Sequence, residues 1–153
     1  MKSTLFILLF VVFFQFKVNA QEVANFSGHW IATEGKVSST VGLNSKCSKV
    51  EIIIEQTANE ILTKVYNAEC DMFGSKWGPI HQEIKNGKVY EQGEEVGKIT
   101  GDALITVSQS GSYQYAYNLK LATQPDGRKT LQSYYGTKGG VGAIVIEAVG
   151  QQI

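Results

Sequence analysis

Short runs in which apolar and polar residues alternate one by one dominate this sequence. The clearest run spans residues 49–56, where Val50, Ile52 and Ile54 share one face and glutamates share the other. A period of two residues is typical of a β-strand with one buried face. After residue 20 we find no stretch of about ten residues with helical periodicity. The sequence therefore predicts an all-β fold.

Turn-forming residues separate the predicted strands. Asn86-Gly87 is the strongest signal, because a type I′ turn needs positive φ at both central positions. Pro125-Asp126-Gly127 is a second, with proline presetting φ and glycine accepting a positive value. The predicted strands are 30–37, 49–56, 61–68, 80–85, 88–92, 96–100, 103–109, 112–123, 129–135 and 143–149. The longer predicted connections are 38–42, 71–79 and a flexible, glycine-rich one at 136–142.

Consecutive strands joined by hairpins predict an antiparallel sheet of about eight to ten strands. Such a sheet avoids exposed edges most simply by closing into an up-and-down barrel, and the many tight hairpins favour a barrel over a two-sheet sandwich. Near its start, Gly28 permits a bend and Trp30 supplies a bulky, rigid side chain. We expect Trp30 to plug one end of the barrel.

The N-terminal segment has the three parts of a secretory signal peptide. Lys2 provides positive charge, residues 5–14 form an unbroken apolar run, and Val18-Asn19-Ala20 places small residues at the cleavage positions. Ten apolar residues are too few to cross a bilayer. We therefore predict cleavage after Ala20 and one mature domain over residues 21–153. With no later apolar stretch of spanning length, this domain is predicted to be soluble and either secreted or periplasmic.

Two cysteines, Cys47 and Cys70, follow the predicted leader. In an exported chain such a pair usually forms a disulfide. Here it would join the start of one predicted strand to the end of its hairpin partner. A metal or catalytic role would need a histidine or acidic residue at ligand spacing, and His29 and His81 are isolated in the sequence. The sequence predicts a structural disulfide and neither a metal nor a cofactor.

The predicted mature chain is almost neutral and carries no catalytic pattern. Without Lys2 and Lys17 it has twelve basic and fourteen acidic residues and no basic cluster, which argues against nucleic acid or an anionic membrane as partner. Ser27 and His29 lie two residues apart with no orienting acid. No glycine-rich phosphate loop opens a helix. The sequence therefore predicts a protein without enzymatic activity.

The start of the predicted barrel, Phe26-x-Gly28-x-Trp30, resembles the opening motif of the calycins, the lipocalin and fatty-acid-binding superfamily. This resemblance implies a barrel that holds a small apolar ligand in its lumen. A Gly-x-Trp start followed by a cysteine pair around the second and third strands also resembles the small periplasmic barrels that inhibit secreted metalloproteases. That second resemblance implies a protein partner, contacted by an N-terminal arm, here Gln21 to Asn25.

One strictly alternating strand offers a candidate binding wall, with three tyrosines followed by Leu119 and Leu121 on one face. If that face points inward, the lumen is lined by hydroxyls at one end and apolar at the other, which suits an amphipathic ligand. The alternative is that the tyrosines pack a filled core or an aromatic ladder. The predicted ligand-binding residues are Trp30, Ile52, Ile54, Tyr113, Tyr115, Tyr117, Leu119 and Tyr135, with Val50 and Leu121 completing the inner wall.

Phe73 and Trp77 lie in the predicted connection 71–79. Two interpretations stay open for them: a lid or partner-binding surface at the barrel mouth, or side chains folded back onto the barrel. Our main hypothesis from the sequence is a secreted barrel that binds a small apolar or amphipathic molecule. The second is a protein-binding inhibitor that acts through its N-terminal arm.

Overall fold

The computed structural model describes residues 23–153. Every helix or strand assigned in that range is a β-strand, which confirms the predicted all-β fold class. The predicted signal peptide and its cleavage site lie outside the described residues. The strands are β1 (Gly28–Ala32), β2 (Gly35–Ser39), β3 (Asn44–Gln56), β4 (Glu60–Cys70), β5 (Gly74–Trp77), β6 (Ile80–Lys85), β7 (Lys88–Glu91), β8 (Glu94–Thr100), β9 (Ala103–Ser110), β10 (Tyr113–Thr123), β11 (Lys129–Gly139) and β12 (Gly142–Gln152). Residues 23–153 contain no helix able to span a membrane.

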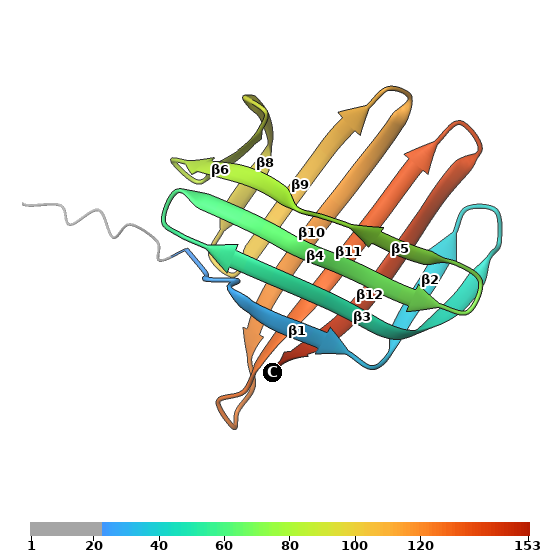
Figure 1. Cartoon of the computed structure of the whole chain (residues 1–153), viewed down its shortest axis with the longest axis horizontal. Coiled ribbons are helices and arrows are strands. Elements are labelled where there is room, and N and C mark those ends of the chain that lie inside the picture. The colour runs from blue at the N-terminus through green and yellow to red at the C-terminus, as the bar shows by residue number, and fades with distance from the viewer. Residues whose placement is uncertain (1–22) are drawn as a thin grey trace, which may run out of the picture.

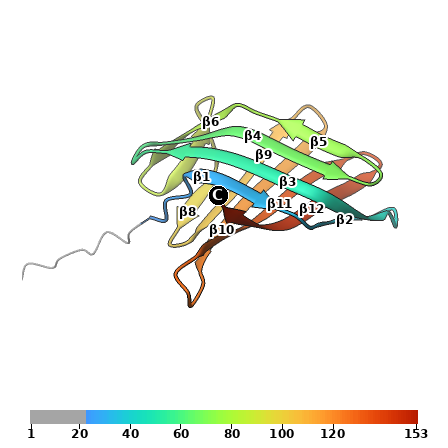
Figure 2. The same cartoon turned by 60° about the horizontal axis from the view of Figure 1, so that its bottom comes forward.

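The strands form one antiparallel sheet that closes on itself (Figures 1 and 2). β1 and β2 share one position in the wall, because both pair with β3 on one side and β12 on the other. β5 and β6 likewise share the position beside β4, and pairing of β3 with β4 closes the ring. The result is a closed ten-stranded barrel, so the barrel prediction is confirmed and the sandwich is not the fold. In Figure 1, β3 and β4 cross in front of β9 to β12, which form the far wall.

Alternating side chains from opposite walls fill most of the interior. Val50, Ile52 and Ile54 of β3 are only 1–3% exposed, as the alternation predicts. Leu119 and Leu131 from the far wall are buried to the same degree. Burying one such side chain contributes about 1.5–3 kcal/mol to stability. These side chains belong to one packed core between the walls.

Phe26 and Trp30 close one end of the barrel. Trp30 is 1% exposed and Phe26 is fully buried, and the Trp30 indole Nε1 donates a hydrogen bond to the Phe26 carbonyl at 3.0 Å. The side chain of Gln56 accepts from the Phe26 N–H and donates to the Ala24 carbonyl. The Ala24 N–H in turn bonds the Gly101 carbonyl in the β8–β9 turn. The expected tryptophan plug is therefore present at this end.

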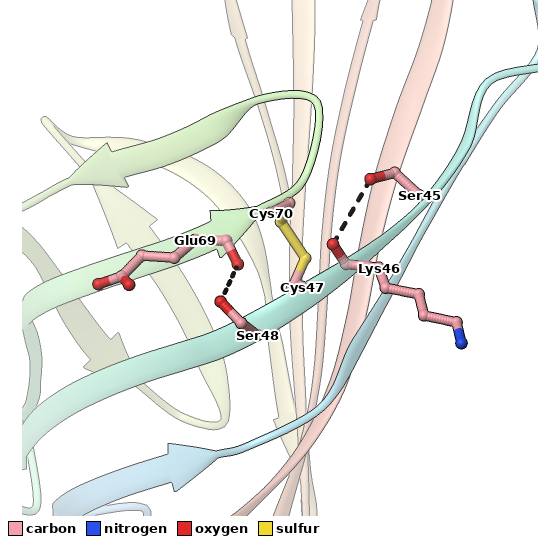
Figure 3. Close-up of a disulfide and its surroundings, with 6 residues drawn as sticks. All are labelled: Ser45, Lys46, Cys47, Ser48, Glu69 and Cys70. Atoms are coloured by element: carbon pink, nitrogen blue, oxygen red, sulfur yellow. Dashed lines mark hydrogen bonds between the residues drawn. A yellow bond between two sulfur atoms is a disulfide. The ribbon is translucent and has the colours of Figure 1, made fainter.

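The predicted disulfide is present and joins Cys47 of β3 to Cys70 of β4 (Figure 3). The two cysteines face each other in the strand register, so the bond lies within the β3–β4 ladder. Beside it, the Ser48 hydroxyl donates to the Glu69 carbonyl. For a separation of 23 residues, loop-closure entropy gives a stabilisation of about 3 kcal/mol. The disulfide joins the C-terminal end of β4 to the point on β3 where pairing with β4 begins.

Three segments differ from the predictions made from the sequence. The strand predicted over 30–37 breaks at Thr33 and Glu34 into β1 and β2. The connection predicted over 71–79 contains β5, which pairs with β4. The flexible connection predicted over 136–142 is mostly paired strand, with β11 and β12 in register up to the Gly139–Gly142 pair.

Tyrosine rings explain why glycines occupy strand positions at the end of β11. A Cβ atom at Gly136 would lie 3.2 Å from the Tyr134 ring, and one at Gly139 would lie 2.6 Å from the Tyr113 ring. The absent side chains leave room for these rings, which cover the glycine backbone. The glycines are therefore part of a packed hairpin.

Candidate functional site

A cavity of about 540 Å³ opens at the end of the barrel opposite Trp30. Its lining includes Gln92 of the β7–β8 turn and the last two residues of β9, Gln109 and Ser110, whereas the Trp30 end lies against the β8–β9 turn. The volume falls within the range of small-molecule sites, roughly 300–1,000 Å³. We call it the mouth cavity. Its lining is Trp77, Ile80, Gln82, Glu91, Gln92, Glu94, Val96, Thr106, Ser108, Gln109, Ser110, Tyr115, Tyr117 and Tyr135.

Four aromatic rings pack together at the inner side of the mouth cavity. Tyr66 and Trp77 stack with ring centroids 4.7 Å apart and planes within 8°. Tyr117 meets Trp77 edge-on at 5.0 Å, and Tyr135 lies 5.1 Å from Tyr66 and 5.4 Å from Trp77. Offset-stacked and edge-on pairs of this kind contribute about 0.5–1.5 kcal/mol each beyond burial. We refer to these four residues as the aromatic cluster.

An irregularity in β4 brings Tyr66 into this cluster. The register with β3 slips between Ile53 and Ile54, where Lys64 has no residue opposite it. Thr63 and Tyr66 consequently both point inward although they are three positions apart. A plain alternation through Ile61 and Thr63 would have sent Tyr66 outward.

The bend between β5 and β6 fits against the same irregularity and brings Trp77 to the cavity. Gly78 has a φ of +119°, and a Cβ atom there would lie 2.5 Å from the Lys64 carbonyl oxygen. Only glycine fits such a close backbone approach. The preceding residue, Trp77, pairs with Tyr66 in the ladder, so the two rings stack on the inner face.

Three polar atoms of the aromatic cluster are buried without a hydrogen-bond partner among residues 23–153: the Tyr66 and Tyr117 hydroxyls and the Trp77 indole Nε1. Thr63 lies near the Tyr117 hydroxyl without meeting hydrogen-bond geometry. A buried polar group left unpaired costs about 1–3 kcal/mol. Two of the three atoms belong to side chains that line the mouth cavity, Trp77 and Tyr117, whereas Tyr66 lies behind them and is fully buried.

Burial controls the ionisation of both tyrosines. It raises the pKa of Tyr66 far above the ordinary value, and the neighbouring Tyr117 and Tyr135 add to the shift. Burial also raises the pKa of Tyr117, and the Thr63 side chain offsets a small part of the shift. Both hydroxyls therefore stay neutral in the folded protein and can donate hydrogen bonds.

We expect two of the seven tyrosines to resist ionisation until the barrel unfolds. Below pH 10, the ordinary tyrosine pKa, these groups are neutral in both states and leave stability unchanged. Above it stability falls, because only the unfolded chain ionises them readily. Tyrosinate absorbance and circular dichroism should be followed together during alkaline titration. The ionisation of Tyr66 and Tyr117 should be the last absorbance step and should coincide with the loss of structure. Loss of that coincident step in a Tyr66→Phe/Tyr117→Phe variant would confirm the assignment, whereas full ionisation of the folded protein would contradict it.

Polar side chains complete the wall of the mouth cavity. The Thr106 hydroxyl donates to the Tyr117 carbonyl at 2.7 Å, which joins β9 to β10 beside the cluster. Gln82, only 4% exposed, donates from Nε2 to the Glu91 carboxylate at 3.2 Å. The cavity can therefore offer aromatic faces, hydroxyls and a fixed carboxylate to one bound molecule.

The structure divides the predicted ligand-binding residues between two places. Tyr115, Tyr117 and Tyr135 line the mouth cavity. Tyr113 lies on the same face but is half exposed at the strand start. The others are buried in the packed interior and do not line the cavity: Trp30, Ile52, Ile54 and Leu119.

Sequence reasoning missed Tyr66, Gln82 and Glu91, and it named Trp77 only as a lid or partner-binding surface or as a ring folded back onto the barrel. Trp77 was placed in a connection, because β5 is only four residues long and pairs with β4 alone. Gln82 had a usable signal, since it alternates with Ile84 in β6 and both face inward. Phe73, which shared the predicted connection with Trp77, packs partly buried against the core.

Other candidate regions have less to offer a ligand. A second cavity of about 1250 Å³ lies at the β1–β2 break, where Glu34, Lys36 and Lys46 expose mixed charges. His29 on the outer face pairs with Glu51 at 2.7 Å, and this bond, with one from Lys49, lowers the pKa of the Glu51 carboxyl. Within residues 23–153, no three His, Cys, Asp or Glu side chains gather as a metal site.

Comparison with known proteins adds no assignment to this geometry. No protein-family model matches the chain, and no curated protein matches it significantly.

Proposed function

We propose that this chain is an exported, lipocalin-like binding protein that takes up a small amphipathic molecule in the mouth cavity. The observation that carries the proposal is the cavity itself, whose lining includes three members of the aromatic cluster, Trp77, Tyr117 and Tyr135. A concave site with aromatic walls and a few converging polar groups is typical of small-molecule binding. The closed barrel supports a calycin-like assignment, and the disulfide suits an oxidising compartment.

The binding end and the plugged end have separate roles in this proposal. Trp30, Ile52, Ile54 and Leu119 make the rigid interior, and the mouth cavity uses the rings that the interior supports. The ligand contacts we propose are Tyr115, Tyr117, Tyr135 and Trp77. Rigid support lowers the ordering cost of binding, because the rings are held before a ligand arrives.

The alternative function, inhibition of a protein partner through Gln21 to Asn25, has weaker support. The main chain of Ala24 is bonded to the barrel at both its N–H and its carbonyl, and the Asn25 side chain accepts from the Ser27 N–H. Gln21 and Glu22 lie outside the described residues. The part of the arm that is described is thus held against the barrel at Ala24.

Ligand uptake should change the fluorescence of Trp77, because its ring lines the cavity and Trp30 is buried at the other end. We expect titration with a panel of fatty acids, retinoids, phenols and arylalkyl amines to give a saturable change that Trp77→Phe abolishes. Tyr115→Ala should weaken binding about tenfold, since an aromatic contact contributes roughly 1–1.5 kcal/mol.

Tyr134→Ala is the matched control, because Tyr134 lies on the opposite face of β11 from Tyr135 and does not line the cavity. It should leave affinity unchanged. A folded protein that gives no saturable response to any class in the panel would contradict the proposed function.

A further inference from the structure

The charged residues that line the mouth cavity all have one sign. Its lining includes the carboxylates Glu91 and Glu94 and no lysine, arginine or histidine. The nearby Lys88 is occupied on the outside, where its ammonium lies 2.7 Å from the Glu95 carboxylate. An anionic ligand would therefore enter a negative field with no cation to pair with it.

Glu91 is held in place at the cavity wall. Its Oε2 accepts a hydrogen bond from the nearly buried Gln82 side chain at 3.2 Å, and both residues line the cavity. A fixed carboxylate binds a cation with less loss of side-chain entropy than a free one. Glu94 lies at the exposed rim, where it adds to the field that an approaching ligand meets.

The aromatic faces suit the same kind of ligand. Trp77, Tyr117 and Tyr135 line the cavity with their rings, and ring faces attract organic cations that approach within about 6 Å. The Tyr117 hydroxyl, on a side chain that is only 7% exposed, has no partner among residues 23–153. The wall thus combines aromatic rings with a carboxylate, and one of these rings, Tyr117, carries a buried hydroxyl without a partner among residues 23–153.

We propose that the mouth cavity selects arylalkyl amines in their ammonium form and excludes carboxylates of the same shape. The aromatic body would pack on the cluster, and the ammonium would lie toward Glu91 and Glu94. This proposal rests on the proposed function and specifies its ligand class. It also departs from the fatty-acid ligand that the calycin resemblance alone would suggest.

Three molecules with the same phenol ring and different side chains test the selection by isothermal titration calorimetry: tyramine, neutral 4-ethylphenol and 3-(4-hydroxyphenyl)propanoate. We expect tyramine to bind at least about tenfold more tightly than 4-ethylphenol. Of the three molecules, 3-(4-hydroxyphenyl)propanoate should bind most weakly. The tyramine affinity should fall as salt is raised, because the rim carboxylates are partly exposed.

Two charge-neutralising variants distinguish an effect of the Glu91 carboxylate at the site from a general effect of net charge. Glu91→Gln should weaken tyramine binding about three- to tenfold and leave 4-ethylphenol binding unchanged. Glu95→Gln is the matched control: it makes the same charge change four residues away, where the side chain pairs with Lys88 on the outside. It should leave the affinity for both molecules unaltered.

The outcomes distinguish this proposal from the function it rests on. Equal affinity for the three molecules, or tighter binding of the carboxylate, would overturn the charge selection while leaving a ligand-binding barrel. An equal loss of tyramine affinity in Glu91→Gln and Glu95→Gln would also overturn it, because the effect would then come from net charge. If none of the three binds while another class in the fluorescence panel does, the amine class is wrong and the function stands.

Discussion

Replacing Trp30 with alanine should lower the free energy of unfolding by about 4 kcal/mol, in the upper range for large core residues. The indole is 1% exposed, and its neighbours cannot close the space it would leave. A Cβ atom at Gly28 would already lie 3.1 Å from the indole Nε1, and one at Gly150 would lie 3.4 Å from the Trp30 Cβ. Backbone walls of this kind relax little, so most of the cavity should persist. Chemical denaturation followed by circular dichroism measures the loss.

Trp30→Phe is the control that separates packing from hydrogen bonding. It keeps a ring in the plug and removes the indole donor to the Phe26 carbonyl, so we expect a smaller loss of about 1–2 kcal/mol. Because Trp30 and the mouth cavity lie at opposite ends of the barrel, this variant should bind ligand like the native protein. A loss below about 1 kcal/mol in Trp30→Ala would show that the plug is not a packed element.

The parts of this fold that follow a regular pattern could be predicted from the sequence. Alternation places Val50, Ile52 and Ile54 inside, and the cysteine pair matches the β3–β4 register. Asn86 and Gly87 have φ values of 53° and 75°, as the predicted hairpin turn requires. Each of these features depends on neighbours in sequence or on one hairpin, so local rules are sufficient.

The candidate site depends on features that local rules do not register. Tyr66 faces inward only because the register of β4 with β3 slips by one residue at Lys64. Alternation of apolar and polar residues does not reveal where such a slip occurs. Trp77 reaches the cavity because Gly78 packs against the Lys64 carbonyl, a contact between segments that the sequence shows only as a glycine before a proline. The tyrosines of β10 were found, since they obey the alternation. Tyr66 was not found, and Trp77 was named without its place in the aromatic cluster.

The same irregularities show how one chain has both a packed interior and an open end. At the Trp30 end, β1 pairs with both β3 and β12, and side chains fill the space between the walls. At the other end, β5 pairs with β4 only, and β6 alone continues the wall to β7. The other edge of β5 is therefore unpaired within residues 23–153, and the rings of the aromatic cluster lie beside it at the mouth cavity. The mouth cavity is therefore a consequence of where the β5–β6 bend falls.

Gly97→Ala should destabilise the barrel by about 3 kcal/mol or more, through overpacking between two strand backbones. Gly97 pairs with Thr106 across β8 and β9, and a Cβ atom there would collide with the Ile105 carbonyl oxygen and lie 2.8 Å from the Thr106 Cα. Both obstacles are main-chain atoms, so relief requires the strands to separate beside Val96 and Thr106, which line the cavity. Gly140→Ala is the control, because nothing lies within 4 Å of its Cβ position. Denaturation should leave that variant within about 0.5 kcal/mol of the native protein, and equal effects from the two substitutions would contradict a steric cause at Gly97.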